Sequence, residues 1–315
     1  MAHAHFADRL IEECRKKKSQ VVVGLDPRMA MMPSGMLEGH AGRNPAEAAD
    51  CIVRFNEAVL DEVREIAAAV KVQIAFYERF GREGLRAYSR TLQAAREKQL
   101  LVIGDVKRND IGSTAAAYAE GHLPGADPDD AGLDWPASGD FQADAITVNP
   151  LFGSDGVRPF LDRAVASGSG VFVLVRTSNP SSGEIQDLRS ERGSVYERTA
   201  ELVGRWGEDS RGREGYSLLG AVAGATFPQE LSDLRERMPH TLFLVPGFGA
   251  QGGGVDDVLG AFDSRGEGAA VNSSRGIIYA FRREPYKDKY GEKHWRKAVR
   301  EAAESMRRNI WGATH

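Results

Sequence analysis

The chain has 315 residues, of which 41 are Lys or Arg and 45 are Asp or Glu, so its formal net charge is −4. This slightly acidic balance argues against partners such as nucleic acid or an anionic membrane, and no apolar run approaches the roughly 18 residues of a membrane span. Its two cysteines, Cys14 and Cys51, cannot form a disulfide framework, so we expect a cytoplasmic location.

Short aliphatic or β-branched runs alternate with helical patterns along the whole chain. After a helix at about 4–18, strands are predicted at 20–26, 70–77, 100–107, 143–149, 170–176, 218–226, 241–246 and 269–274. The intervening helices are expected at 45–68, 81–98, 112–120, 156–167, 192–208, 228–237 and 254–264, with a last helix at about 290–310. Eight strands alternating with helices favour an α/β fold with parallel pairing, closed as a (β/α)8 TIM barrel with extra terminal helices.

One segment near 121–140 interrupts this alternation and is rich in proline, glycine and aspartate. The alternation resumes after it, so we interpret it as an inserted loop rather than a linker. Residues 1–315 are therefore expected to form a single barrel domain. The N-terminal residues lack the apolar centre of a secretory signal, and the seven histidines show no HxxxH or HExxH spacing, so no metal site is expected.

Charged residues stand where barrel strands should be apolar on both faces. Lys71 and Gln73 share one face of the second strand, Asp105 and Lys107 share one face of the third, and Asp26 ends the first. An ion-pair network that only stabilises the fold would be one explanation. A functional site is favoured, because each desolvated charge costs several kcal/mol unless it is paired, and such clusters concentrate at the carboxyl ends of barrel strands.

The third strand continues into a run that alternates acid, base and acid, at Asp105, Lys107 and Asp110. Neighbouring carboxylates favour the charged form of a lysine. A lysine held in that form is a proton donor rather than a Schiff-base nucleophile. The pattern therefore predicts chemistry in which negative charge develops on the substrate.

A glycine-rich turn at 246–254 follows the seventh strand, and Gly247, Gly249 and Gly252 match the dinucleotide fingerprint G-x-G-x-x-G. That motif needs an acidic residue at the end of the next strand, where this chain has Arg275 instead. This disfavours a nicotinamide dehydrogenase and favours a phosphate site, with Arg275 as a bidentate partner. The turns that carry Asn149 and Ser178 fit a polar heterocycle, a ribose or an ordinary turn equally well.

These features together resemble the orotidine 5′-phosphate decarboxylase family. The resemblance rests on the motif Asp105-x-Lys107-x-x-Asp110-Ile111, on the upstream strand lysine Lys71, on Leu25-Asp26, and on the turns that begin at Pro246 and at Ser274-Arg275-Gly276. Val148-Asn149-Pro150 and the strand from Lys71 resemble the longer, type 2 bacterial branch, and the similarity covers about residues 21–279.

The resemblance implies an enzyme that converts orotidine 5′-monophosphate to UMP and CO2 in pyrimidine synthesis, without a metal or other cofactor. Lys107 would protonate C6 of the pyrimidine, and Asp105 would lie against the departing carboxylate. Lys71 would orient Asp105 and, with Asp26, contact the ribose. Asp110 would complete the charged network from the neighbouring subunit of a homodimer.

The remaining substrate contacts that the resemblance implies are spread over several turns. Ser178 would contact the pyrimidine, and Gln251 and Arg275 would hold the phosphate. Ile111 and Thr114 would accompany Asp110 across the dimer interface. Asn149, Pro246 and Ser274 complete the expected substrate-binding set.

Two other functions remain open from the residues alone. One is a magnesium-dependent keto-sugar phosphate decarboxylase or aldolase of the same barrel group, which would need a metal-binding carboxylate on the second strand, where this chain has Lys71. The other is a nucleotide-binding barrel without catalytic activity.

Overall fold

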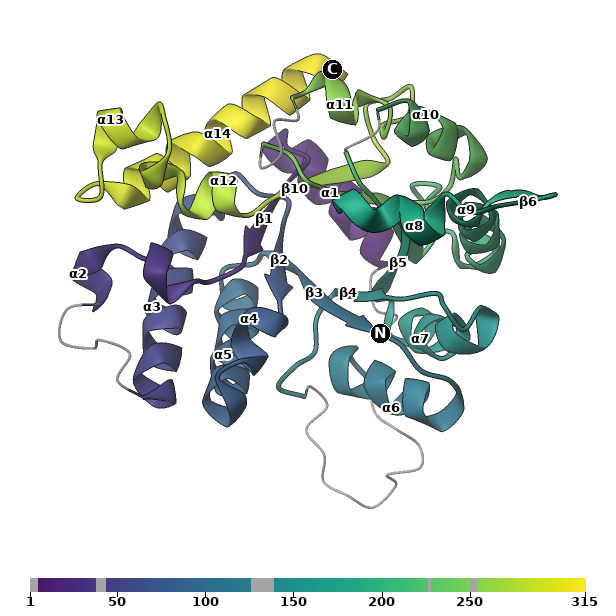
Figure 1. Ribbon diagram of the computed structural model, residues 1–315, viewed down its shortest axis with the longest axis horizontal. Helices are drawn as coiled ribbons and strands as arrows, with labels where there is room; N and C mark the ends of the chain where they lie inside the picture. Colours follow the sequence, from purple (N-terminus) through teal and green to yellow (C-terminus); the bar gives the residue numbers. More distant parts are fainter. Residues whose placement is uncertain (1–4, 38–43, 126–138, 226–227, 250–253) are drawn as a thin grey trace.

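Parallel strands close into a barrel in the computed structural model, which describes residues 5–37, 44–125, 139–225, 228–249 and 254–315 (Figure 1). Around the barrel the order is β1-β10-β9-β8-β5-β4-β3-β2, so the first and last strands pair and close the sheet. The bounds are β1 (Val21–Leu25), β2 (Ala69–Gln73), β3 (Leu101–Arg108), β4 (Ala145–Val148), β5 (Gly170–Arg176), β8 (Leu219–Ala223), β9 (Phe243–Pro246) and β10 (Ala269–Ser273). The predicted (β/α)8 barrel is confirmed.

Helices surround the barrel and follow nearly every strand (Figure 1). Their bounds are α1 (Phe6–Lys17), α2 (Ser34–Leu37), α3 (Pro45–Val63), α4 (Ala75–Glu78), α5 (Gly81–Glu97), α6 (Gly112–His122), α7 (Ser154–Ser167), α8 (Gly183–Gln186), α9 (Val195–Trp206), α10 (Pro228–Arg237), α11 (Asp256–Leu259), α12 (Arg275–Ile278), α13 (Tyr286–Tyr290) and α14 (Trp295–Thr314). Short 3-10 turns lie at Met29–Met31, Pro180–Ser182, Glu208–Ser210 and Ala280–Arg282. A small hairpin, β6 (Arg189–Ser190) with β7 (Gly193–Ser194), precedes α9.

Helix α1 covers the amino-terminal end of the barrel. The Phe6 ring meets the Phe172 ring edge to face with 5.9 Å between the ring centres, and the Phe6 amide donates to the carbonyl of Gly168 just before β5. Arg15 pairs with Glu214 and Glu267, which precede β8 and β10. The opposite, carboxyl-terminal end is therefore the open end, as a barrel enzyme requires.

Several predicted boundaries were wrong. The second strand ends at Gln73 rather than at 77, and 75–78 form the helical turn α4, in which Tyr77 is buried and accepts a hydrogen bond from Asn56. A short apolar run does not distinguish a strand from a buried helical turn, which is why periodicity misplaced this end. The helix predicted at 45–68 ends at Val63, and the one predicted at 254–264 spans only Asp256–Leu259.

The predicted insertion lies largely outside the described residues, since 126–138 are not described. Its first residues are helical, because α6 continues to His122. The strand predicted at 218–226 ends at Ala223, and the last helix starts at Trp295 instead of about 290. Across the described ranges, no helix combines the length and the apolar character needed to cross a membrane.

The register of the strands brings the charged positions together. Gly24 of β1 lies opposite Lys71 of β2, and Gln73 of β2 lies opposite Asp105 of β3. The pairing of β3 with β4 shifts between Gly104 and Arg108, in the stretch that contains both Asp105 and Lys107.

Candidate active site

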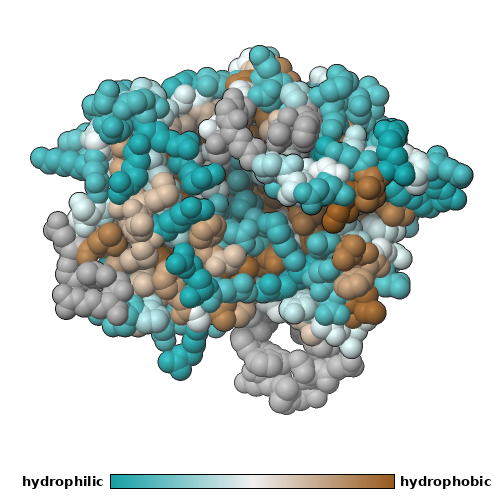
Figure 2. All heavy atoms as spheres, viewed as in Figure 1, coloured by the Kyte–Doolittle hydropathy of each residue, from teal (hydrophilic) through white to brown (hydrophobic). Residues whose placement is uncertain are grey.

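A cavity of about 470 Å3 lies at the carboxyl-terminal mouth of the barrel. Figure 2 shows that the molecular face is hollowed near its centre, where hydrophilic residues gather. The lining residues come from all eight barrel strands and the loops that follow them, namely Asp26, Lys71, Gln73, Asp105, Lys107, Thr147, Leu174, Thr177, Ser178, Asn179, Val222, Leu244, Pro246, Asn272 and Ser274. Asp26, Lys71, Asp105, Lys107, Ser178, Pro246 and Ser274 were predicted as site residues and share this cavity.

Asp105 is the centre of the charged cluster. Lys71 Nζ lies 2.7 Å from its Oδ2, and Lys107 Nζ lies 2.5 Å from its Oδ1. Gln73 donates to Oδ2 at 2.9 Å, and the Thr147 hydroxyl donates to Oδ1 at 2.9 Å. Both carboxylate oxygens therefore accept two hydrogen bonds each, which fixes the carboxylate in one orientation.

The two buried charges of this cluster stabilise each other. Burial alone would raise the pKa of Asp105, but the nearby ammonium groups of Lys71 and Lys107 outweigh it and hold that pKa well below its usual range. For Lys71 burial opposes the charged form, yet the carboxylates of Asp105 and Asp26 outweigh it and raise its pKa. Asp105 is therefore a carboxylate and Lys71 an ammonium at neutral pH.

Lys107 reaches the cavity from an unusual backbone conformation. Its φ is +45°, a left-handed value that is uncommon for a residue with a side chain. Its amide donates to the Thr147 hydroxyl at 3.0 Å, and the shifted register of β3 and β4 accommodates this turn. The side chain remains 45% exposed, so its ammonium is accessible to a ligand while it contacts Asp105. Strained backbone that is held by its surroundings is typical of functional positions.

Two buried oxygens in the cavity lack a hydrogen-bond donor. Oδ1 of Asp26 and Oδ1 of Asn272 accept no hydrogen bond from any described residue, although Asp26 Oδ1 lies 3.9 Å from Lys71 Nζ. Buried acceptors are rarely left unpaired, so both can receive hydroxyl donors from a ligand. Sequence reasoning missed Asn272, although a polar residue near the end of the last predicted strand was the available signal.

Gln73, Thr147, Thr177 and Asn179 also line the cavity without having been predicted as site residues. Thr147 is the polar residue of an otherwise apolar strand, β4, and that position could have identified it. Gln73 shares a strand face with Lys71, which was the corresponding signal on β2.

Asp110, Ile111 and Thr114 lie outside the cavity, where β3 leads into α6. Asp110 accepts a hydrogen bond from the Ile111 amide at 2.9 Å, and the side chains of Ile111 and Thr114 are exposed. Asn149 is also absent from the lining, because its side-chain oxygen accepts from the Leu151 amide at 3.0 Å and closes its own turn. The structure thus does not place Asn149 at the cavity.

The predicted phosphate end is described in part. Pro246 and Ser274 line the cavity, whereas Gln251 lies outside the described residues. Arg275 begins α12 next to Ser274 and is exposed, and it is not among the lining residues. Gly247 and Gly249 have φ values of +104° and +70°, a conformation that favours glycine, so this turn requires its glycines.

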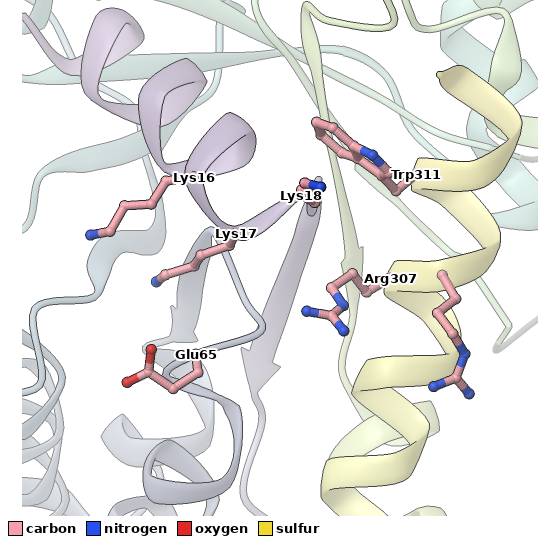
Figure 3. Close-up of a pocket in the computed structure, with 7 residues that line it drawn as sticks. Lys16, Lys17, Lys18, Glu65, Arg307 and Trp311 are labelled. Carbon is pink, nitrogen blue, oxygen red and sulfur yellow. The ribbon is translucent and has the colours of Figure 1, made fainter.

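A second cavity, of about 530 Å3, lies where the end of α1 approaches α14 (Figure 3). It is lined mainly by cations, namely Lys16, Lys17, Lys18, Arg307 and Arg308, together with Glu65 and Trp311. Lys16 and Lys17 both pair with Glu13 at 3.0 Å, and cations stabilise the carboxyl-terminal end of a helix such as α1. A structural role accounts for these charges, and the mouth cavity remains the candidate site.

The described residues contain no group of three or more His, Cys, Asp or Glu side chains arranged to hold a metal ion. The carboxylates at the mouth, Asp26 and Asp105, are both within 4 Å of the Lys71 ammonium. A cation would have to displace that ammonium to bind between them.

The family profile described as "Orotidine 5′-phosphate decarboxylase / HUMPS family" matches residues 19–285. The chain belongs to this family. An orotidine 5′-phosphate decarboxylase of Rhodopirellula baltica is 39% identical over 307 residues, which cover 98% of this chain and 99% of the relative. One of Clostridium kluyveri is 40% identical over 283 residues, covering 89% and 90%.

Solved structures of orotidine 5′-phosphate decarboxylases share the fold. The OMP decarboxylase of Leishmania donovani superposes with a TM-score of 0.69 at 30% identity, covering 96% of this chain and 98% of that one. The UMP synthase of the same organism gives a TM-score of 0.70 at 32% identity, covering 96% of this chain and 57% of that one. The predicted family resemblance is confirmed.

Proposed function

We propose that this protein decarboxylates orotidine 5′-monophosphate to UMP and CO2 in pyrimidine biosynthesis. The observation that carries the proposal is the Lys71–Asp105–Lys107 array at the barrel mouth, in a chain whose relatives are named for this activity. The array presents one fixed carboxylate beside one accessible ammonium. This is the pair of charges that a reaction passing through a substrate carbanion needs.

In the proposed reaction the bond between C6 and the carboxylate carbon breaks, and its electron pair stays on C6 as CO2 leaves. The ammonium of Lys107 stabilises that developing charge and then gives its proton to C6, so that UMP forms and the lysine recovers a proton from solvent. Asp105 lies beside the departing carboxylate, and Lys71 holds Asp105 in place. Only interactions that strengthen in the transition state accelerate the step, which is why preorganised charges matter more here than tight binding of the carboxylate.

The other lining residues are assigned to the rest of the nucleotide. The unpaired oxygens of Asp26 and Asn272 would accept hydrogen bonds from the ribose hydroxyls. Ser178 would contact the pyrimidine, while Pro246, Ser274, Gln251 and Arg275 would surround the phosphate. A phosphate held far from C6 contributes binding energy that positions the reacting carbon.

The decisive experiment is an assay of the purified protein with orotidine 5′-monophosphate in excess chelator, following the loss of the orotate absorbance. We expect full turnover, because the array contains no metal-dependent element and Lys71 stands where a metal-binding carboxylate would be needed. If a keto-sugar phosphate is turned over only with magnesium, the aldolase-type alternative is correct instead. UMP binding without turnover of either substrate would indicate a non-catalytic nucleotide-binding barrel.

We further propose that the enzyme is a homodimer in which Asp110 completes the partner's site. Large apolar side chains are exposed next to Asp110, with Ile111 51%, Leu151 75% and Phe152 51% exposed. The backbone carbonyl of Asp110 and the Cβ of Phe152 both lie against Gly156, so these two chain segments are neighbours. A surface of this kind next to an active-site mouth fits an interface with a second copy.

Leu151→Glu should convert the dimer to monomers, because it would bury an unpaired charge in the interface. Light scattering after size-exclusion chromatography measures the mass. Val165→Glu is the control, since Val165 lies on α7 and is 56% exposed.

A shared site also predicts complementation between Asp110→Ala and Lys107→Ala, both inactive alone. Random reassortment of subunits would restore about a quarter of the wild-type sites. A monomeric wild-type protein, or no complementation after subunit exchange, would contradict the shared site.

Two further assignments accompany this function. The whole chain, residues 1–315, would act as one domain. The reaction would take place in the cytoplasm, in keeping with two buried cysteines, Cys14 and Cys51, that are not joined by a disulfide.

A further inference from the structure

Arg176, the last residue of β5, is buried behind the mouth cavity without lining it, and its side chain is 3% exposed. Its guanidinium donates to Glu230 through Nε at 2.6 Å and through Nη2 at 3.0 Å. Its Nη1 lies 2.7 Å from Oδ1 of Asp187. The guanidinium carbon also lies 4.7 Å from the centre of the Tyr196 ring. One cation thus joins the segments after α8, at the start of α10 and on α9.

Arg176 and Asp187 stand at the two ends of the loop 177–186, which carries part of the cavity wall. Thr177, Ser178 and Asn179 directly follow Arg176 and line the cavity. The loop is closed by Gln186, whose Oε1 accepts from the Thr177 amide at 3.0 Å and whose Nε2 donates to the Thr177 hydroxyl at 2.7 Å. Asp187 is the next residue, so its ion pair with Arg176 ties the far end of the loop to the strand that begins it.

The neighbouring strand supports the same loop from the other side. The Gly224 amide, just after β8, donates to the Arg176 carbonyl at 2.8 Å. A Cβ on Gly224 would lie within 2.9–3.1 Å of the Cβ, N and Cα atoms of Ser178, so Ser178 packs directly on this glycine. The position of Ser178 therefore depends on β5, on β8 and on the helices that Arg176 joins.

A buried guanidinium with two acidic partners could serve stability alone. The chain contains a matched example in Arg235, which is also buried and donates to the carbonyls of Ala261, Met238, Thr241 and Gly268. Those carbonyls lie before β9 and β10, at the end of the barrel opposite to the mouth. Arg176 differs because it directly precedes the cavity-lining residues 177–179 and pairs with Asp187, which follows the glutamine that closes that loop.

We propose that Arg176 is a positioning residue that holds Ser178 against the pyrimidine ring of the substrate by clamping α8 to α10. This inference rests on the proposed function for the identity of the ring. The guanidinium contacts Glu230 through Nε and Nη2 and Asp187 through Nη1 at the same time. A lysine ammonium cannot reproduce this planar geometry. Loss of either acidic partner of Arg176 would increase the mobility of the loop 177–186 while the barrel stays folded.

The experiment compares Arg176→Lys, Asp187→Asn and the control Arg235→Lys. We expect kcat/KM for orotidine 5′-monophosphate to fall about 10- to 100-fold in the first two, chiefly through a higher KM, because a displacement of about 1 Å in a positioning group has effects of this size. Asp187 is half exposed, so Asp187→Asn should do this with little change in melting temperature. Arg235→Lys should lower the melting temperature and leave the KM of the folded enzyme near the wild-type value.

Hydrogen exchange keeps this test separate from the proposed function. The amides of 177–188 should exchange faster in Arg176→Lys and Asp187→Asn than in wild type, whatever substrate the protein takes. If the wild type fails to decarboxylate orotidine 5′-monophosphate while these amides exchange faster in the two variants, the proposed function is wrong but the positioning role of Arg176 is supported. If exchange is unchanged, or if KM rises no more than in Arg235→Lys, Arg176 has only a structural role.

Discussion

Lys107→Ala should lose decarboxylation by about 1,000-fold or more while UMP affinity stays within a few-fold of wild type. In the proposed mechanism the variant loses both the proton donor and the cation that stabilises the developing carbanion, which sets the expected size. UMP carries no carboxylate at C6, and the residues proposed for its phosphate and ribose lie on other strands. Steady-state kcat and calorimetric binding of UMP measure the two effects separately.

Two further variants make this prediction specific. Lys107→Arg keeps a cation beside Asp105, but a guanidinium does not give up a proton at neutral pH, so its kcat should stay far below the wild-type value. Lys98→Ala is the control, because Lys98 directly follows α5 and pairs with Asp61 away from the mouth. A Lys107→Ala enzyme within tenfold of the wild-type kcat would rule out Lys107 as the proton donor.

Asp105→Asn should lower both activity and stability. The carboxylate accepts hydrogen bonds from Lys71, Gln73, Lys107 and the Thr147 hydroxyl, and an amide can accept only part of them. Lys71 would then be buried with only Asp26, at 3.9 Å, as an anionic partner. Removing one member of a buried ion pair lowers the free energy of unfolding by about 3–5 kcal/mol, and we expect kcat to fall at least 100-fold.

The stability effect should depend on pH with a definite sign. Because the pKa of Asp105 is depressed in the folded protein, its contribution is complete above the pKa of about 3.9 of the unfolded chain and declines as the pH falls below it. Chemical unfolding at pH 7 and near pH 3 should therefore show a smaller difference between wild type and Asp105→Asn at the lower pH. An equal difference at both values would contradict the charged pair as its source.

The double variant Lys71→Met with Asp105→Asn separates stability from catalysis. Replacing both members of the buried pair removes the uncompensated Lys71 ammonium that Asp105→Asn alone leaves, so much of the free energy of unfolding should return. Activity should not return, because the carboxylate that the proposed reaction uses is still absent. Recovery of activity together with stability would show that Asp105 acts only through folding.

The fold was predictable because its repeating unit is local. Each strand is a short aliphatic run between turn residues, and the predicted positions of β3, β5 and β9 agree closely with the observed bounds. The prediction failed where an apolar run changes conformation without changing composition, as at Ala75–Glu78. It also missed α8 and the β6–β7 hairpin, whose short lengths carry too little periodicity to be recognised.

The charged cluster at the mouth was predictable for a different reason. Two lysines and an aspartate on neighbouring barrel strands cost several kcal/mol each to desolvate unless they are paired, so Lys71, Asp105 and Lys107 stood out against the aliphatic strands. Alternation along a strand also placed Asp105 and Lys107 on one face. Residue type identified the charged cluster, and the two-residue period of a strand placed Asp105 and Lys107 on the same face.

What remained for the tertiary structure to decide were contacts between residues far apart in the chain. Closure of the barrel pairs Val22 with Asn272, and only that pairing places the Asn272 oxygen in the cavity with Asp26. The backbone turn at Lys107 depends on the Thr147 hydroxyl from the next strand, and the guanidinium of Arg176 depends on helices from two later loops. Periodicity along a strand records which face a side chain occupies, whereas its partners depend on register and on loop packing, which are set by the whole barrel.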